Sequence, residues 1–138
     1  MPAHTDESRT DAPRTHLEID RALCGTPVRL APGFAEVSLT TLAVMSVDDR
    51  GLVHGGFMFG LADHAAMLAV NDPNVVLGAA STRFLKPVTV GEVVLARASV
   101  GVESGRKRSV AVEVLRGEDP VMTGEFSCFV LDRHVLEP

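Results

Sequence analysis

The stretch Val53–Asn71 reads V-H-G-G-F-M-F-G-L-A-D-H-A-A-M-L-A-V-N and decides the fold of this chain. It follows a turn sequence, residues 48–51, and ends at a helix-breaking sequence, residues 71–73. At 100° per residue its apolar side chains fall on all sides of the axis, which is typical of a buried helix. The run is too short and too interrupted to span a bilayer. We therefore predict one long helix at the centre of the core.

Only two strongly polar side chains, Asp63 and His64, lie in the body of this helix. A carboxylate on a buried helix is costly unless it has partners. Gly56, Gly60 and Asp63 share one side of the helix, so small residues leave space beside the carboxylate. The alternative is a structural carboxylate bonded to neighbouring backbone. His64 projects about 100° away, and we expect it to be a packed or interface residue rather than a catalytic one.

The sequence His54-Gly55-Gly56 opens the helix. Backbone N–H groups at a helix N-terminus are free and attract negative charge. Two glycines there let another group approach the backbone closely. One segment therefore offers an amide-lined anion site and, two turns on, a carboxylate.

The composition indicates one domain with an aliphatic core. The chain has 138 residues, 46% of them hydrophobic, without Trp or Tyr. A net charge of -5 argues against a nucleic-acid surface. Cys24 and Cys128 belong to no ligand cluster, so we predict no metal and no cofactor, and a reducing cytoplasm as the location. We find no signal peptide and no transmembrane segment.

Polarity divides the chain into a disordered tail over residues 1–14 and a single domain over residues 15–138. A short helix is expected from Thr15 to a stop at Gly25. Alternating polarity predicts strands over residues 33–47, 75–85, 92–103, 107–116 and 121–131. Most are joined by tight turns, which give an antiparallel sheet. We predict an α+β fold in which five to six strands wrap around the central helix.

Three pieces of sequence carry a family resemblance. The first is His54-Gly55-Gly56, followed after Gly60 by Leu61-Ala62-Asp63. The second is the run R-F-L-K-P-V at residues 83–88, and the third is the turn S-G-R-K at residues 104–107. Over roughly residues 34–131 the chain resembles the hotdog-fold acyl-CoA thioesterases, close to the phenylacetic-acid-pathway type and similar to 4-hydroxybenzoyl-CoA thioesterase.

The resemblance implies a hotdog fold, a homodimer or homotetramer, and active sites at the dimer interface. It implies that Asp63 is the base or nucleophile and that Gly55 supplies the N–H that polarises the thioester carbonyl, with His54 beside it. Many relatives have an Asn or Gln six residues before the histidine, where this chain has Asp48, an acceptor in place of a donor.

Basic residues could bind the phosphates of coenzyme A. Coenzyme A is expected only as part of the substrate and not as a cofactor. They form a cluster in one predicted hairpin, Arg106, Lys107 and Arg108. Arg83 and Lys86 are expected near the helix start, with Gly56 at the substrate. A solvated turn is the alternative for the hairpin cluster.

We therefore expect an acyl-CoA thioesterase that hydrolyses an acyl-CoA to the free acid and coenzyme A. Negative charge builds on the carbonyl oxygen, and preorganised backbone donors stabilise it. The Gly-x-Ser-x-Gly motif of α/β-hydrolases is absent. The alternative is a non-catalytic hotdog module that binds acyl-CoA, and a hotdog dehydratase is a weaker third reading. Acyl chain length and character stay open.

Overall fold

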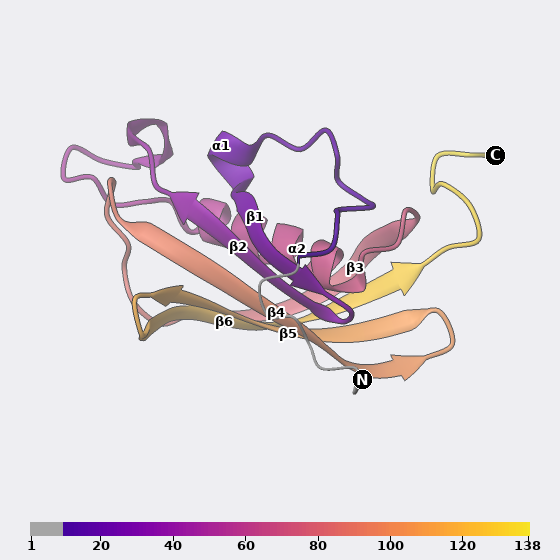
Figure 1. The fold of residues 1–138 in the computed structure, drawn as a ribbon. Helices are drawn as coiled ribbons and strands as arrows, with labels where there is room; N and C mark the ends of the chain where they lie inside the picture. Colours follow the sequence, from indigo (N-terminus) through magenta and orange to yellow (C-terminus); the bar gives the residue numbers. More distant parts are fainter. Residues whose placement is uncertain (1–9) are drawn as a thin grey trace.

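The structure, a computed structural model, describes residues 10–138. One antiparallel sheet of six strands curls around a single long helix, α2 (Figure 1). The strands lie in the order β1-β2-β4-β5-β6-β3. Their bounds are Thr26–Ala31 (β1), Phe34–Thr40 (β2), Val75–Phe84 (β3), Val93–Ser104 (β4), Lys107–Arg116 (β5) and Asp119–Val130 (β6). This confirms the predicted α+β hotdog fold.

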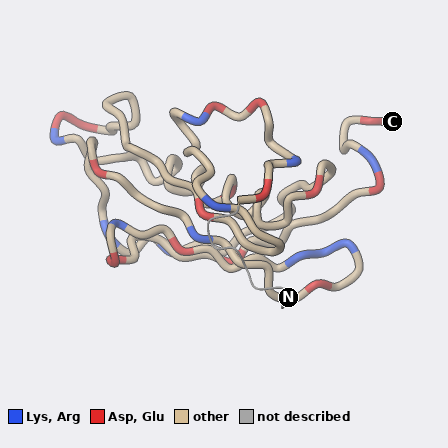
Figure 2. Tube along the Cα trace, in the orientation of Figure 1, with Lys and Arg blue, Asp and Glu red and all other residues tan. Residues whose placement is uncertain are grey.

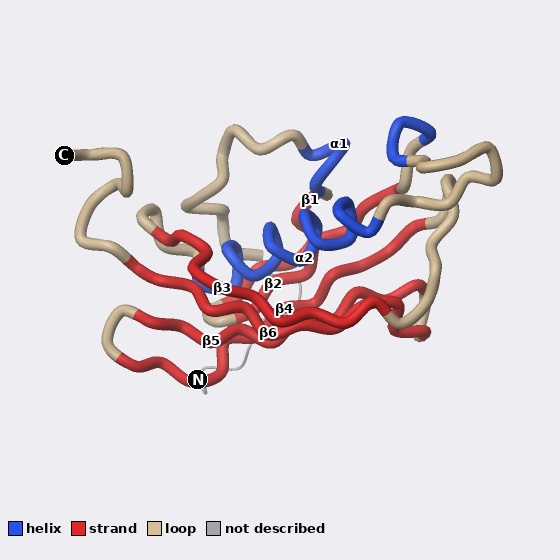
Figure 3. The backbone as a smooth tube through the Cα atoms, turned by 180° about the vertical axis from the view of Figure 1, so that it is seen from behind, coloured by secondary structure: helices blue, strands red, loops and turns tan. Residues whose placement is uncertain are grey.

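Helix α2 spans Gly55–Val70 and lies on the concave face of the sheet (Figure 3). Nine of its residues are buried, because apolar side chains leave it in nearly every direction. Asn71 ends the helix in a left-handed conformation at φ 54°, as the sequence predicts for an Asn before Asp-Pro. The core on which α2 packs is aliphatic, with Phe126 as its largest fully buried side chain.

The predicted strand over residues 33–47 is wrong beyond Thr40. Thr41 is buried, and its hydroxyl donates to the carbonyl oxygens of Thr89 and Glu92. These bonds anchor the end of the strand, and a short 3-10 helix, Ala43–Met45 (η1), follows. Alternating polarity alone does not reveal this turn, because Thr41 occupies an inward position like a strand residue.

The predicted helix from Thr15 shrinks to α1, Arg21–Cys24, which Asp20 caps with its carboxylate. Its predicted stop is confirmed, since Gly25 has φ +97° and its Cβ position lies 2.7 Å from Leu61 Cδ1. Strand β1 follows directly and was not predicted, because Pro27 lowers the strand signal. The pairing of β1 with β2 shifts register after Pro27, as expected where a proline interrupts an edge strand.

Residues Thr10–Cys24, here named the strap, cross the side of α2 that faces away from the sheet (Figures 1 and 3). The Asp11 N–H donates to the Leu30 carbonyl, at 2.9 Å. Asn71 accepts from the Arg14 N–H and donates to the Ala12 carbonyl, at 2.7 and 3.1 Å. Residues 1–9 of the predicted tail lie outside the described part, so their disorder stays a prediction.

Candidate functional site

The start of α2 is uncapped by any side chain. His54 holds the N-cap position, and its side chain makes no capping hydrogen bond. Its N–H donates to the Met45 carbonyl, at 2.9 Å, which ties the helix start to η1. The first N–H groups of a helix have no partner within the helix, so they are available to an external acceptor. The Phe57 N–H already donates to the His54 carbonyl at 3.0 Å, which leaves the N–H groups of Gly55 and Gly56 as the donors of the predicted anion site in the described part of the chain.

Two aromatic rings approach this backbone because glycines occupy it. The Cβ position of Gly55 lies 3.3 Å from the ring of Phe84, and that of Gly56 lies 3.0 Å from the ring of His54. The His54 ring in turn contacts the edge of the Phe57 ring, with centroids 6.2 Å apart. Any larger residue at Gly56 would displace His54, so the glycines set the geometry of the site.

An apolar cavity of about 300 Å³ adjoins Gly55. It opens between the start of α2 and the end of β3. Its walls are Val53, Met58, Phe84, Leu85, Lys86, Pro87, Val88 and Val121. An acyl group beside the helix start would therefore meet mostly hydrocarbon.

Asp63 lies in the body of α2, one turn after a glycine that has open space beside it. A Cβ built at Gly60, one turn before it, would meet nothing within 4 Å. The Oδ1 atom of Asp63 is buried and has no hydrogen-bond partner among the described residues. Burial raises the pKa of this carboxyl to about 6. A backbone-bonded structural carboxylate would have a satisfied Oδ1, so the alternative considered from the sequence is not favoured.

Both cysteines lie close enough to Asp63 for its charge to act on them. Burial raises the pKa of the Cys128 thiol to about 12, and the negative charge of Asp63 adds to that shift. The pKa of the Cys24 thiol is raised by burial, then by Asp20 and Asp63. Cys24 therefore places the end of α1, and with it the strap, near the carboxylate.

His64 is a packed residue, as predicted. It is buried, and its Nδ1 lies 3.0 Å from the Cys24 carbonyl oxygen, so Nδ1 donates. Its ring stacks on that of His16, with centroids 6.4 Å apart and planes at 22°. Burial lowers the pKa of both histidines. His64 thus fastens the strap to α2 beside Asp63.

One chain does not bring the predicted amide and the predicted acid together. Gly55 and Asp63 lie on the same helix, eight residues apart, which corresponds to about 12 Å along its axis. Reacting groups must approach to about 3–3.5 Å. A thioester at Gly55 therefore cannot meet Asp63 of the same chain.

Asp48 faces its own loop. Its Oδ1 accepts from the N–H groups of Arg50 and Leu52, at 2.9 and 3.2 Å. The carboxylate is thus already occupied in shaping the exposed loop before α2. Its predicted catalytic role stays a prediction, and nothing in the described part places it beside Asp63.

The basic hairpin lies at the opposite end of the sheet from the start of α2 (Figures 1 and 2). Arg106 pairs with Asp132 at 2.6 Å, and Arg108 pairs with Glu103 at 3.3 Å. Among the described residues Lys107 has no ion-pair partner. The cluster is therefore remote from Gly55 of the same chain, and only its lysine is unpaired.

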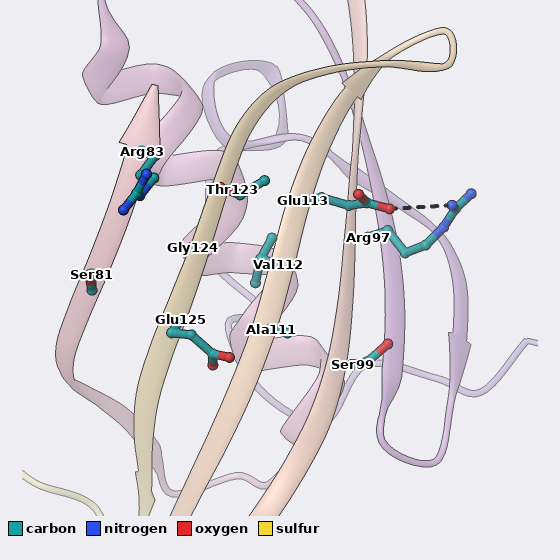
Figure 4. Close-up of a pocket in the computed structure, with 10 residues that line it drawn as sticks. All are labelled: Ser81, Arg83, Arg97, Ser99, Ala111, Val112, Glu113, Thr123, Gly124 and Glu125. Carbon is teal, nitrogen blue, oxygen red and sulfur yellow. Dashed lines mark ion pairs between the residues drawn. The ribbon is translucent and has the colours of Figure 1, made fainter. Parts of the chain in front are cut away.

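Arg83 and Lys86, predicted near the helix start, separate in the structure. Lys86 lines the cavity beside Gly55, although its Nζ pairs with Asp119 at 2.7 Å. Arg83 instead lines a groove on the face of the sheet that points away from α2 (Figure 4). Strand alternation gives the helix side to its neighbour Phe84. Phe84 is the site residue that the sequence reasoning missed, and alternation along R-F-L-K-P-V was the signal for it.

Comparison with known proteins identifies the family. The model of the thioesterase superfamily matches residues 50–123, which include both the helix start and Asp63. The chain belongs to the thioesterase superfamily. A solved structure of an uncharacterized protein from Pyrococcus horikoshii has a TM-score of 0.92 and 51% identity, over 94% of this chain and 99% of that one. A mutant of the phenylacetic acid degradation protein PaaI from Thermus thermophilus has a TM-score of 0.73 and 33% identity, over 80% and 96%.

Two curated relatives are longer than this chain, and neither is named as a thioesterase. A stretch of 120 residues is 53% identical to part of the methylthioribose-1-phosphate isomerase of Aquifex aeolicus, covering 86% of this chain and 26% of that protein. A stretch of 80 residues is 36% identical to the transcription factor FapR of Shouchella clausii, covering 57% of this chain and 41% of that one. The chain thus spans between a quarter and a half of these two relatives.

The described residues contain no group of three or more His, Cys, Asp and Glu side chains placed to bind a metal ion. Within the same part of the chain, α2 and every other helix are too short or too polar to cross a membrane.

Proposed function

We propose that this thioesterase-superfamily chain hydrolyses an acyl-CoA, and that each active site is built from two copies of the chain. The observation that carries the proposal is the Asp63 carboxylate, which is largely buried and whose Oδ1 has no hydrogen-bond partner among the described residues. It needs donors or a reactant from outside its own chain. The N–H of Gly55 is too far along the helix to meet it within one chain.

Strand β3 supplies a way to join two copies. It is the last strand of the sheet and, within residues 10–138, pairs only with β6, so its other edge presents free N–H and C=O groups. Along β3 the residues from Gly78 to Ser81 are exposed and uncharged. A two-fold axis through this strand continues the sheet into the second copy. The two α2 helices then run side by side in opposite directions, and the start of one approaches the middle of the other.

Hydrolysis in such a pair uses groups already described. The thioester carbonyl oxygen lies at the Gly55 N–H of one copy, and its acyl group occupies the cavity beside it. Asp63 of the other copy takes a proton from water, whose oxygen attacks the carbonyl carbon. Negative charge moves to the carbonyl oxygen, where the backbone donor stabilises it. When the C–S bond breaks, the sulfur leaves with the electron pair and receives the proton from Asp63.

Direct attack by Asp63, with a mixed anhydride as intermediate, is the other route consistent with these positions. A single turnover in ¹⁸O-water separates the two. Water attack places the label in the product acid at the first turnover, whereas anhydride hydrolysis at the enzyme's carbonyl leaves the first product unlabelled.

Asp63→Asn tests the proposal because it keeps the size of the side chain and removes its basic oxygen. We expect kcat to fall by roughly two or more orders of magnitude, as for a lost general base, with acyl-CoA binding retained. A panel of aliphatic and aromatic acyl-CoA substrates, followed with a thiol reagent, also fixes the acyl preference. Wild-type turnover by folded Asp63→Asn would refute the catalytic role.

Mixing two inactive variants tests the shared site. In a pair formed by Asp63→Asn and Gly55→Val, one site carries both changes and the other carries none. Free exchange makes half of the pairs mixed, so we expect about a quarter of wild-type activity to return. If both groups acted within one chain, the mixture would stay inactive.

A binding module without catalysis is the second candidate, and the similarity to the transcription factor FapR favours it. Such a module would retain acyl-CoA stoichiometrically and release no thiol. Mass spectrometry of material that copurifies with the protein, together with the thiol assay, distinguishes binding from turnover.

A further inference from the structure

Among the residues that the structure describes, the cavity beside Gly55 has one charged residue in its wall, Lys86. The other side chains of the wall are apolar. In the proposed reaction this cavity receives the acyl group, so the charge of its wall bears on which acyl groups bind there. A negatively charged acyl group would be attracted to Lys86 only if the ammonium group of Lys86 were free.

The ammonium group of Lys86 is already bound to a carboxylate. Its Nζ donates to Asp119 Oδ1 at 2.7 Å, and Asp119 Oδ2 accepts from Arg116 at 3.3 Å. The hydrogen bond from Lys86 is the main cause of a lowered pKa of Asp119, and the bond from Arg116 also lowers it, although desolvation acts in the opposite direction. Asp119 therefore stays charged at neutral pH and balances the charge of Lys86.

Arg116 ties this pair to the backbone of the cavity wall. Its guanidinium also donates to Glu92 Oε1 at 3.1 Å and to the Pro87 carbonyl oxygen at 2.8 Å. A planar guanidinium holds several acceptors in fixed directions. We name four residues the wall cluster: Lys86, Glu92, Arg116 and Asp119. The wall cluster contains two positive and two negative charges, so it presents no net charge to the cavity.

We propose that the wall cluster makes the site specific for acyl groups that carry no charge at the end of the chain. A terminal carboxylate would leave water for an apolar cavity, which is costly unless a cation is free to pair with it. Lys86 would have to leave Asp119 to form that pair, and the charge of Asp119 would repel the incoming carboxylate. An uncharged acyl group gains from burial of its hydrocarbon without these costs.

The size of the cavity narrows this class of substrates. Its volume of about 300 Å³ lies at the lower end of the range for small-molecule sites, about 300–1,000 Å³. A short aliphatic chain or a single ring therefore fits better than a long fatty acyl chain. The inference rests on the proposed function for the position of the acyl group, but it needs only binding and not turnover.

Two substrates of equal chain length isolate the effect of the terminal charge. Hexanoyl-CoA ends in a methyl group and adipoyl-CoA in a carboxylate. Both carry the same coenzyme A, so contacts to its phosphates cancel in the ratio of their kcat/KM values. The wild type should favour hexanoyl-CoA by at least about tenfold. The methyl ester of adipoyl-CoA, which is uncharged, should recover most of the difference.

Charge changes in the wall cluster should move the ratio of adipoyl-CoA to hexanoyl-CoA turnover in opposite directions. Asp119→Asn frees Lys86 and leaves a net positive charge, so the ratio should rise at least about threefold. The rise is modest because the Lys86 and Asp119 side chains are 52% and 39% exposed. Lys86→Met should lower the ratio, and the two changes together should return it toward the wild-type value.

Glu118→Gln is the matched control. It removes a carboxylate next to Asp119 that lies outside the cavity wall and has no ion-pair partner among the described residues. The ratio should stay at the wild-type value. Circular dichroism checks that each variant is folded.

Binding measurements separate this inference from the proposed function. S-hexyl-CoA and S-(5-carboxypentyl)-CoA are thioethers that cannot be hydrolysed, and calorimetry measures their affinities. If no thioester is turned over but the wild type binds the uncharged thioether more tightly, the enzyme is refuted and the specificity stands. Equal affinities, tighter binding of the carboxylated thioether, no binding of either, or no relative gain for the carboxylated compound in Asp119→Asn would each overturn the inference.

Discussion

Asp63 combines two properties that a catalytic carboxylate needs, a largely buried position and an Oδ1 atom with no hydrogen-bond partner among the described residues. Burial disfavours the charged form, which makes the group more basic at neutral pH than an exposed aspartate. The same burial has a cost in stability, because the folded state must hold the charge without a partner.

The raised pKa of Asp63 gives a signed prediction for pH. The folded carboxyl has a pKa of about 6 against an ordinary value of 3.8, so the folded state binds the proton more tightly. Its effect on stability is therefore unfavourable above pH 6 and disappears as the pH falls toward 4. Asp63→Asn should raise the free energy of unfolding by roughly 1–3 kcal/mol at pH 7.5 and change it little at pH 4. Urea titrations at both pH values measure this.

Activity should follow the ionised form of the same residue. We expect kcat/KM to rise with pH and level off above about pH 6, where Asp63 is charged. A flat profile between pH 5 and 7.5 would contradict the assignment of Asp63 as base. Loss of stability in Asp63→Asn at pH 7.5 would instead indicate a structural carboxylate.

The sequence pattern identified Asp63, Gly55 and Gly56 because each is an exception on an otherwise apolar helix. It misplaced Arg83, because the position of a motif in the chain does not say which face of a strand its residues occupy. Phe84, the next residue, lies against Gly55 instead. The separation between Gly55 and Asp63 follows from helix geometry alone. The proposed second copy, which brings an Asp63 to Gly55, cannot be read from the periodicity of the sequence.

At the scale of elements, α2 and the strands from β3 to β6 were predictable from periodicity to within about two residues. Strand β1 and the turn at Thr41 were not. Pro27 and Gly25 weaken the strand pattern at the start of β1. Thr41 ends β2 through hydrogen bonds to residues 89 and 92, which are distant in sequence. Such contacts exist only in the folded chain.

The strap should loosen in acid because two stacked histidines hold it to α2. Burial lowers the pKa of His16 and of His64. The positive charges of His16 and Arg21 lower the pKa of His64 further, whereas its hydrogen bond to the Cys24 carbonyl raises it in part. The neutral forms of both histidines favour the closed strap, so its stability is complete above pH 6.5 and falls as the pH drops through that value. Amide exchange of residues 10–25, corrected for intrinsic rates, should be faster at pH 5.5 than at pH 7.5.

Gln at both histidine positions is the matched control for the strap. Gln keeps a donor and does not titrate, so the difference in exchange between the two pH values should shrink. A difference as large as in the wild type would assign the acid response to other groups.

The basic hairpin between β4 and β5 is tested through the substrate. Arg106→Ala with Lys107→Ala should raise KM for acyl-CoA more than it lowers kcat, because contacts to phosphates bind ground and transition states alike. An acyl-pantetheine substrate, which lacks the nucleotide phosphates, should show no change. An unaltered KM for the CoA ester would leave the hairpin as a solvated turn.

At the scale of the whole molecule, the sheet has two edges of different character. Along β1, Pro27 removes one N–H, a register shift interrupts the ladder, and the strap covers the Leu30 carbonyl through the Asp11 N–H. The edge of β3 has no proline, and a single charged residue, Arg83, lies along it. If two copies join through β3, the edges of the sheet that stay unpaired in the described part of the chain are the two protected β1 edges.

This asymmetry limits how far the sheet can grow. A sheet in which both edge strands are unpaired and unprotected can add further chains at each edge without limit. This is the first step toward fibrils. In the proposed pair the unpaired edge of β3 lies in the two-fold contact, and a two-fold contact closes on itself. The protected β1 edge then lies at each end of the continuous two-copy sheet. Concentrated protein should therefore form discrete particles and resist conversion into filaments.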